Sequence, residues 1–410
     1  MAANADGQDG TLRARIIATL FALILPVALL APLGLSPLGI LIALTVLGLT
    51  WKDRPWRRGP RWLPVLLALL TIYALVSTTW TPDARVGFKG GLQITGTAIA
   101  IWMLVGGLAC LRRGELARVA RWSLAGLAVS VAILLVDRLM DQALIGWVHH
   151  MAGSSWRDFA RAATKRGVTV AVIAVWPLAM LLDRRGAVAA FALAAAAVAL
   201  GHSSTALVAL VAGSVGAGVA WLAARRTGLG LAAALVAFIL AAPWVVLQLP
   251  EPQPLWDRAP WIPNSLHHRL TIWRFAADHI AERPLLGWGM EASRVIPGGD
   301  DTILVRRDYG VLSTVHHEAL LPLHPHSMAI QWWLELGAVG AGLCAALVAM
   351  ACLAAGGRRD RVLAALSLGM ILSVATASAS AFGAWQSWWL LALGMTSALA
   401  AAAPDPRKES

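Results

Sequence analysis

Long apolar runs alternate with short polar segments along nearly the whole chain. Runs of about 17–25 apolar residues recur at the length that a helix needs to cross a bilayer. Twelve of them predict membrane-spanning helices, at roughly 16–33, 37–51, 62–80, 91–111, 117–137, 167–182, 187–202, 204–224, 229–249, 327–353, 361–380 and 384–403. The pattern therefore predicts an all-α polytopic membrane protein, with a single membrane domain over residues 1–410.

Two connections between these runs are much longer than the others. Residues 138–166 form one, and residues 250–326, between the ninth and tenth runs, form the larger. A long loop in a chain otherwise reduced to turns is usually functional, although a structural lid is the alternative. We expect the large loop to contain short helices and to carry part of the activity.

Composition excludes a soluble protein, because 58% of the residues are hydrophobic. It also excludes a disulfide framework: the three cysteines lie in or at the ends of the apolar runs and none lies in an external loop.

The charges are distributed unevenly between the two sides of the predicted membrane. Of 34 basic residues, 20 fall in one set of connections together with only 8 acids, so that side carries the entire net charge of +12. Basic residues in short loops stay cytoplasmic, which predicts cytoplasmic termini. The basic charge thus has a topological cause and does not indicate a nucleic-acid partner. All ten histidines fall on the opposite, external side.

The large loop contains one predicted amphipathic helix, over residues 266–280, which Ser265 can cap. Its spacing places Arg269 on the same face as three apolar residues, Trp273, Ala276 and Ile280. We interpret Arg269 as a ligand-binding residue. Two other arginines, Arg274 and Arg283, are expected only to extend along the surface or to pair with acids.

The end of this loop reads His324-Pro325-His326-Ser327 as the chain re-enters the membrane. Pro325 keeps the entry extended and Ser327 can cap the next helix, which places His326 at the interface. A neutral imidazole there can serve as a general base near pH 7. Glu335 lies nine residues on, about 180° around the helix, so we do not expect it to pair with His326. No other ligand group has a spacing that would complete a metal site with the two histidines.

A third segment precedes the sixth apolar run. Arg157, Arg161 and Lys165 repeat every four residues, and Arg166 lies at the interface beside Gly167. Anchoring to lipid head groups is the preferred interpretation for Arg157. The remaining arginines of the segment could form, together with the arginine of the large loop, a cationic cradle for phosphate oxygens.

These three segments resemble the O-antigen ligase and polymerase superfamily. The most diagnostic is His324-Pro325-His326-Ser327 followed by Glu335-Leu336-Gly337 and Gly340, which resembles a His-x-His-Asn pattern followed by Glu-x-Gly. The other two are Arg269 through Trp273 to Pro284-Leu285-Leu286-Gly287-Trp288-Gly289, and Lys165-Arg166-Gly167 ahead of Trp176-Pro177. The first half of the chain matches mainly by its run of spans. Ser327 stands where Asn is common in the family.

The resemblance implies a glycosyltransferase of the bacterial inner membrane with a periplasmic active site. In the ligase branch, the donor is an O-antigen linked to undecaprenyl diphosphate and the acceptor is a sugar hydroxyl of lipid A–core. His326 and Arg269 would be the catalytic residues, with inversion at the anomeric carbon. No metal or other cofactor is expected, and the remaining substrate-binding residues would be Arg161, Lys165, Arg166 and His324.

Several alternatives remain open at this level. O-antigen polymerases and protein O-oligosaccharyltransferases share the motifs, and the sequence separates them poorly from ligases. A transporter would place ionisable groups near the membrane midplane and often shows inverted repeats. The span centres here are almost free of such groups. A structural scaffold would not explain the concentration of His and Arg in the external loops.

Overall fold

The computed structural model describes residues 2–151, 156–250, 252, 258–259, 261, 264–309 and 312–405. Helices dominate these residues, which confirms the predicted all-α polytopic architecture. The helices are α1 (Ala2–Ala22), α2 (Ile24–Leu30), α3 (Leu35–Thr50), α4 (Trp62–Ser77), α5 (Ala84–Leu108), α6 (Arg113–Leu139), α7 (Ala143–Met151), α8 (Trp156–Leu181), α9 (Arg184–Gly201), α10 (Ser204–Leu247), α12 (Asn264–Glu282), α13 (Met328–Gly356), α14 (Arg361–Ser380) and α15 (Ser387–Ala402).

Each of the twelve predicted spans coincides with a helical segment. In the described part of the chain, nine segments are long and apolar enough to cross a membrane, and α4 and α15 are shorter apolar helices. One of the nine, α10, has 44 residues and contains a non-helical residue, Ala223 (φ −152°, ψ 67°). This kink divides α10 into the two spans predicted at 204–224 and 229–249. The boundary between them is therefore a break within a helix rather than a loop.

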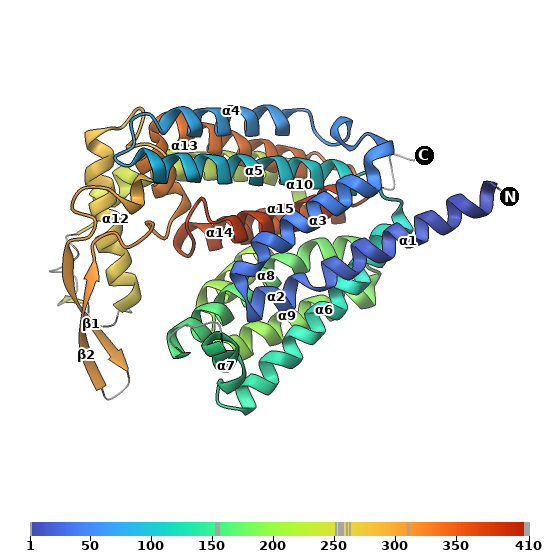
Figure 1. The fold of residues 1–410 in the computed structure, drawn as a ribbon, viewed down its shortest axis with the longest axis horizontal. Coiled ribbons are helices and arrows are strands. Elements are labelled where there is room, and N and C mark those ends of the chain that lie inside the picture. Colours follow the sequence, from blue (N-terminus) through green and yellow to red (C-terminus); the bar gives the residue numbers. More distant parts are fainter. Residues whose placement is uncertain are drawn as a thin grey trace.

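The start of α1 and the end of α15 lie at one end of the bundle, and α12 lies at the opposite end (Figure 1). This arrangement agrees with an even number of crossings. Helices from the two halves of the chain are interleaved: α5 packs against α15, α8 against α14, and α4 against α13. Among the described residues, the larger of two buried hydrophobic clusters extends from Ile17 to Ala400.

Small residues allow close approach at the centre of the bundle. The Trp176 indole of α8 donates to Ser373 Oγ at 3.0 Å, and this hydroxyl donates to the Ala209 carbonyl at 2.8 Å. A Cβ on Gly213 or on Gly369 would lie 2.6 Å from the Trp176 ring. Such small residues are typical of helix interfaces within lipid.

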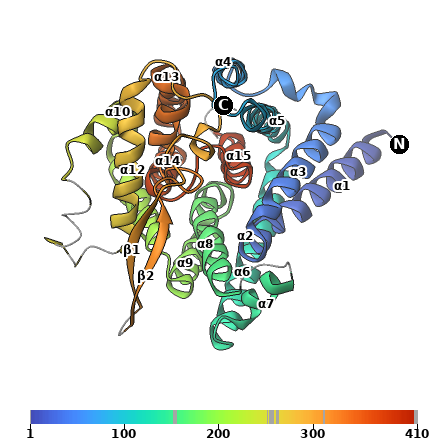
Figure 2. The ribbon, with the colours of Figure 1, turned by 60° about the vertical axis from the view of Figure 1, so that its left-hand side comes forward.

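The large external loop contains α12, the short 3-10 helix η4 (Ala292–Arg294) and a β-hairpin. Strands β1 (Thr302–Tyr309) and β2 (Leu312–Ala319) pair antiparallel, from Thr302 opposite Ala319 to Tyr309 opposite Leu312. The hairpin extends beyond the end of α12 (Figure 2). The hairpin is a correction to the expectation from the sequence, which was of short helices only in this loop. The missed signal is two runs with many β-branched residues, which favour strands.

Candidate active site

The site is built on a break in α13. Gly337 has φ 59° and ψ −160°, so the helical hydrogen bonding is interrupted there. The turn that follows α12 pairs with the exposed backbone: Trp288 N donates to the Leu334 carbonyl at 2.8 Å, and Ala338 N donates to the Pro284 carbonyl at 2.9 Å. Two of the segments that carry the family resemblance therefore form one structural unit.

We expect Gly337→Ala to destabilise this unit strongly. The backbone conformation of Gly337 is essentially restricted to glycine, and an added Cβ would lie 2.5 Å from the carbonyl carbon of Leu285. The free energy of unfolding should fall by at least about 2 kcal/mol. Thermal unfolding in detergent measures the effect. Gly342→Ala is the matched control, because a Cβ at Gly342 in the same helix would meet no atom within 4 Å. Equal unfolding temperatures for the two variants would contradict this account of the break.

His326 is the last residue of the large loop, two residues before the start of α13, and has φ 56°. This left-handed conformation costs a residue with a side chain about 1 kcal/mol and is often found at functional sites. Its Nδ1 lies 3.2 Å from the carbonyl oxygen of Ala381, in the connection between α14 and α15. A carbonyl only accepts hydrogen bonds, so Nδ1 carries the hydrogen and Nε2 keeps its lone pair. His326 therefore has the tautomer of a general base.

His324 lies beside His326, with 4.4 Å between the ring centroids. Its Nδ1 accepts a hydrogen bond from the backbone N–H of His326 at 3.1 Å. The hydrogen of a neutral His324 is then on Nε2, where it needs an acceptor. Gln386 supplies one when its side-chain amide is turned by 180°, because its amide nitrogen lies 3.0 Å from Nε2 while its buried Oε1 has no partner. His324 thus fixes the backbone of His326 and is itself fixed by the start of α15.

Both histidines are neutral at pH 7. Burial lowers the pKa of His326 to about 4, the hydrogen bond to Ala381 opposes this, and the charges of Arg269, His268 and Arg166 lower the pKa further. Burial also lowers the pKa of His324 to about 3, with smaller contributions from His326, Arg294 and Arg166. The charges of Arg166 and Arg269, which come from distant parts of the sequence, both act on His326. The indole of Trp273, one turn after Arg269 on α12, donates to the Pro325 carbonyl at 2.7 Å, so this face of α12 lies against the segment that carries the two histidines.

Arg166 and Arg269 are partly buried arginines without a carboxylate partner among the described residues. Both are half-buried, and burial lowers the pKa of Arg269. The Arg166 guanidinium lies over the Trp388 ring, 5.5 Å from its centroid. Among the residues that the structure describes, no carboxylate lies within ion-pair distance of Arg166 or Arg269. Half-buried guanidinium groups without a protein counter-charge are suited to bind an anionic ligand.

The neighbouring arginines of the large loop are partnered, as the sequence analysis expected. Arg274 lies 3.4 Å from Asp278 one turn along α12. Arg283 packs 3.9 Å from the centroid of the Trp288 ring. Both side chains therefore have structural roles.

The other members of the predicted cradle contribute less to this picture. Lys165 is exposed, and adjacent helical positions point about 100° apart, so it does not share the direction of Arg166. Arg157 and Arg161 lie on α8, but their side chains fall outside the described residues. The cradle formed by described side chains therefore consists of Arg166 and Arg269.

Four further residues of this region were not predicted. Arg294 and His268 act electrostatically on the two histidines. Gln386 contacts His324, and Trp388 lies under Arg166. A signal for the last two was present in the aromatic cluster Trp385-Gln386-Ser387-Trp388-Trp389 at the start of the last span.

Residues 189–345 match the family model of the O-antigen ligase. The resemblance predicted from the sequence is thereby confirmed for the region that holds Arg269, His324 and His326. Two relatives, from Rickettsia conorii and Rickettsia prowazekii, bear names that give polysaccharide ligase as an unverified activity. The first is 32% identical over 160 residues, or 39% of this chain and 37% of the relative. The second is 31% identical over 157 residues, or 38% and 37%. The matched region thus spans less than two-fifths of these relatives, and no solved structure matches the chain.

An apolar cavity of about 300 Å³ lies among the helices of the bundle. Met328, Ala329 and Trp332 from the first turns of α13 line it, together with Trp385 and residues of α4, α5, α10, α14 and α15. Two lining residues adjoin the histidine segment: Met328 follows His326 by two residues, and Trp385 directly precedes Gln386. No histidine or arginine among the described residues lines the cavity.

The lowered pKa of His326 predicts an unusual pH dependence of the reaction rate. If His326 is the general base, the neutral form is the active one, so kcat/KM should stay flat from pH 8 to about pH 5 and fall only as the pH drops through about 4. A bound anion would offset the charges of Arg166 and Arg269, so the acidic limb of kcat should lie at higher pH than that of kcat/KM. Steady-state rates across this range measure both limbs. An acidic limb of kcat/KM near 6.5, the ordinary value for histidine, would contradict the described environment.

Proposed function

We propose that the protein is an O-antigen ligase, a glycosyltransferase that moves a glycan from undecaprenyl diphosphate to a sugar hydroxyl of lipid A–core. One observation carries the proposal: two half-buried guanidinium groups, Arg166 and Arg269, lack a carboxylate partner in the described part of the chain and lie close to His326, whose Nε2 is free to accept a proton. The family match over residues 189–345 supports the same reaction class.

In the proposed reaction, the acceptor hydroxyl attacks the anomeric carbon of the donor sugar. The hydroxyl proton passes to His326 Nε2 while the bond between the anomeric carbon and the diphosphate oxygen breaks. The electron pair of that bond remains on undecaprenyl diphosphate, where Arg166 and Arg269 stabilise the developing charge. A single displacement of this kind inverts the anomeric configuration. His324 keeps His326 in place through its backbone N–H.

The membrane setting suits a lipid-linked donor. The apolar cavity, two of whose lining residues adjoin the histidine segment, would take part of the prenyl chain while the diphosphate meets the arginines. Helix α12, which carries Arg269, lies at the end of the bundle opposite the start of α1 and the end of α15 (Figure 1). With the termini cytoplasmic, as the charge distribution favours, the site faces the periplasm.

An assay with purified protein tests the proposal. The protein is mixed with a glycan linked to undecaprenyl diphosphate and with lipid A–core, in the presence and absence of a chelator. We expect transfer of the glycan to lipid A–core at the same rate in both conditions. Extension of the glycan on the lipid diphosphate without use of lipid A–core would identify a polymerase instead. Transfer only to a peptide would identify a protein O-oligosaccharyltransferase.

A further inference from the structure

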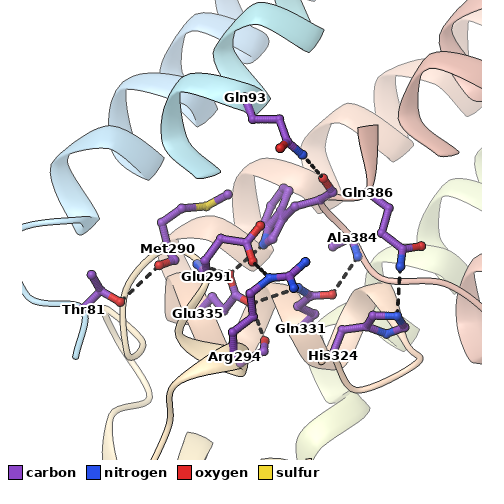
Figure 3. A network of polar contacts seen from close by, with 12 residues as sticks. Thr81, Gln93, Met290, Glu291, Arg294, His324, Gln331, Glu335, Ala384 and Gln386 are labelled. Atoms are coloured by element: carbon purple, nitrogen blue, oxygen red, sulfur yellow. Dashed lines mark hydrogen bonds and ion pairs between the residues drawn. The ribbon is translucent and has the colours of Figure 1, made fainter. Parts of the chain in front are cut away.

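The mechanism above leaves one fully buried acid without a role. Glu335 in α13 has 0% of its surface exposed. Its carboxylate accepts hydrogen bonds from Glu291 N at 2.6 Å, from the Gln331 amide at 2.8 Å and from the Trp385 indole at 2.8 Å, as well as from the Ser293 hydroxyl (Figure 3). Among described residues no cation pairs with it.

Two of the four donors, Trp385 and Gln331, hold the connection between α14 and α15 in place. Trp385 belongs to this connection, and Gln331 Oε1 accepts a hydrogen bond from Ala384 N at 2.7 Å. The same connection supplies the Ala381 carbonyl to His326 and leads to Gln386, which contacts His324. Each histidine therefore has a hydrogen-bond partner on a segment that Glu335 fixes.

The other two donors, Glu291 and Ser293, belong to the turn around η4, so Glu335 also holds this turn in place. Glu291 N and the Ser293 hydroxyl both reach Glu335, and the carboxylate of Glu291 pairs in turn with Arg294. The charge of Arg294 acts on His324. The turn is also fastened to the first half of the chain, because Met290 N donates to Ser77 Oγ at 3.0 Å.

The hydrogen bonds of Glu335 connect segments that also interact with the two histidines, which packing of α13 by itself would not require. A buried carboxylate is costly unless hydrogen bonds satisfy it, and here four donors do so from three separate segments. Two of those segments contact the histidines directly or act on them electrostatically. The arrangement couples the position of the base to a single carboxylate.

We propose that Glu335 is a positioning residue that aims Nε2 of His326 at the acceptor by holding the 381–386 connection and the η4 turn. The proposal rests on the proposed function, since it assigns Glu335 to the same reaction. Glu335 touches neither substrate in this scheme. It acts through Trp385 and Gln331 on one side and through Glu291 and Ser293 on the other.

Glu335→Gln tests the proposal. The substitution keeps the shape but turns one acceptor oxygen into an NH2 group that faces two donors, so two of the four hydrogen bonds are lost. We expect kcat for glycan transfer to fall about 100-fold, because misplacement of a catalytic group by about 1 Å has this effect. The dissociation constant for undecaprenyl diphosphate should stay within about 2-fold of wild type, because Arg166 and Arg269 are unchanged.

Trp385→Phe serves as a second variant if Glu335→Gln does not fold. It removes one donor and keeps an aromatic ring, and we expect about a 10-fold loss of kcat with unchanged lipid binding. Glu115→Gln is the matched control. Glu115 is another buried acid, bonded to Arg13 at 2.8 Å near the end of the bundle that holds the termini. It should change stability and leave kcat unchanged.

A measurement independent of activity separates this proposal from the proposed function. Diethyl pyrocarbonate modifies neutral histidine, and peptide mass spectrometry gives the rate at His326. We expect this rate to change in Glu335→Gln and to stay constant in Glu115→Gln. A wild-type rate at His326 together with a wild-type kcat would overturn the positioning role, and so would a loss of lipid affinity as large as the loss of kcat. If the wild type transfers no glycan, the proposed function fails, while the modification rate still decides the role of Glu335.

Discussion

Replacing His326 with glutamine is expected to lower kcat for glycan transfer by about 10²- to 10⁴-fold, the usual contribution of a general base. Glutamine can keep a hydrogen bond to the Ala381 carbonyl but has no basic nitrogen to accept the acceptor proton. The dissociation constant for undecaprenyl diphosphate should change little, because neutral His326 carries no charge that the diphosphate would meet. Transfer assays and lipid-binding measurements on the purified variant provide the two values.

The control for this variant is His202→Gln. His202 is an exposed histidine in the turn between α9 and α10, at the same end of the bundle as the site by the predicted topology. Its replacement should leave kcat unchanged. A His326→Gln variant with kcat within about 3-fold of wild type would remove the base from the mechanism, since a general base contributes far more than this.

Arg269→Gln is expected to lower kcat/KM for the lipid-linked donor by about 10²- to 10³-fold, the effect of removing one charged or polar donor from a developing anion. Arg269 is half-buried and, within the described ranges, has no carboxylate to offset its charge. The diphosphate would therefore be its main counter-charge. The loss should appear both in lipid binding and in kcat, because the leaving group gains charge in the transition state.

Arg274→Gln is the matched control for Arg269→Gln. It removes the same group from the same helix, but Arg274 already pairs with Asp278. We expect it to retain kcat/KM within about 3-fold, in line with the small energies of exposed ion pairs. Equal losses for Arg269→Gln and Arg274→Gln would show that a general loss of basic charge, or of α12, causes the effect, and would contradict a specific cradle.

The sequence was sufficient to predict the membrane helices because the bilayer limits both their length and their composition. The hairpin β1–β2 was not predicted, since its strands lie in a loop where no bilayer imposes a pattern and the sequence analysis looked there only for helices. At the kink in α10, at Ala223, the sequence predicted the change of span but not the backbone conformation that makes it. The basic residues Arg225 and Arg226 correctly indicated a change of span, but the backbone stays helical on either side.

The candidate site could be predicted only in part. External histidines and arginines stand out against the positive-inside bias, which is why His326 and Arg269 were identified. The Ala381 carbonyl that fixes the tautomer of His326 has no side-chain signal. Gln386 contacts His324, and the charge of Arg294 acts on it, only because the Glu335 network brings distant segments together. Such tertiary contacts are not encoded in local spacing.

The most direct test of the account is a cryo-EM structure of the protein in nanodiscs with undecaprenyl diphosphate. The account predicts density for the diphosphate between the guanidinium groups of Arg166 and Arg269, beside Nε2 of His326, with the prenyl chain entering the apolar cavity at Met328. Diphosphate density at the end of the bundle that holds the termini, or away from both arginines, would contradict it.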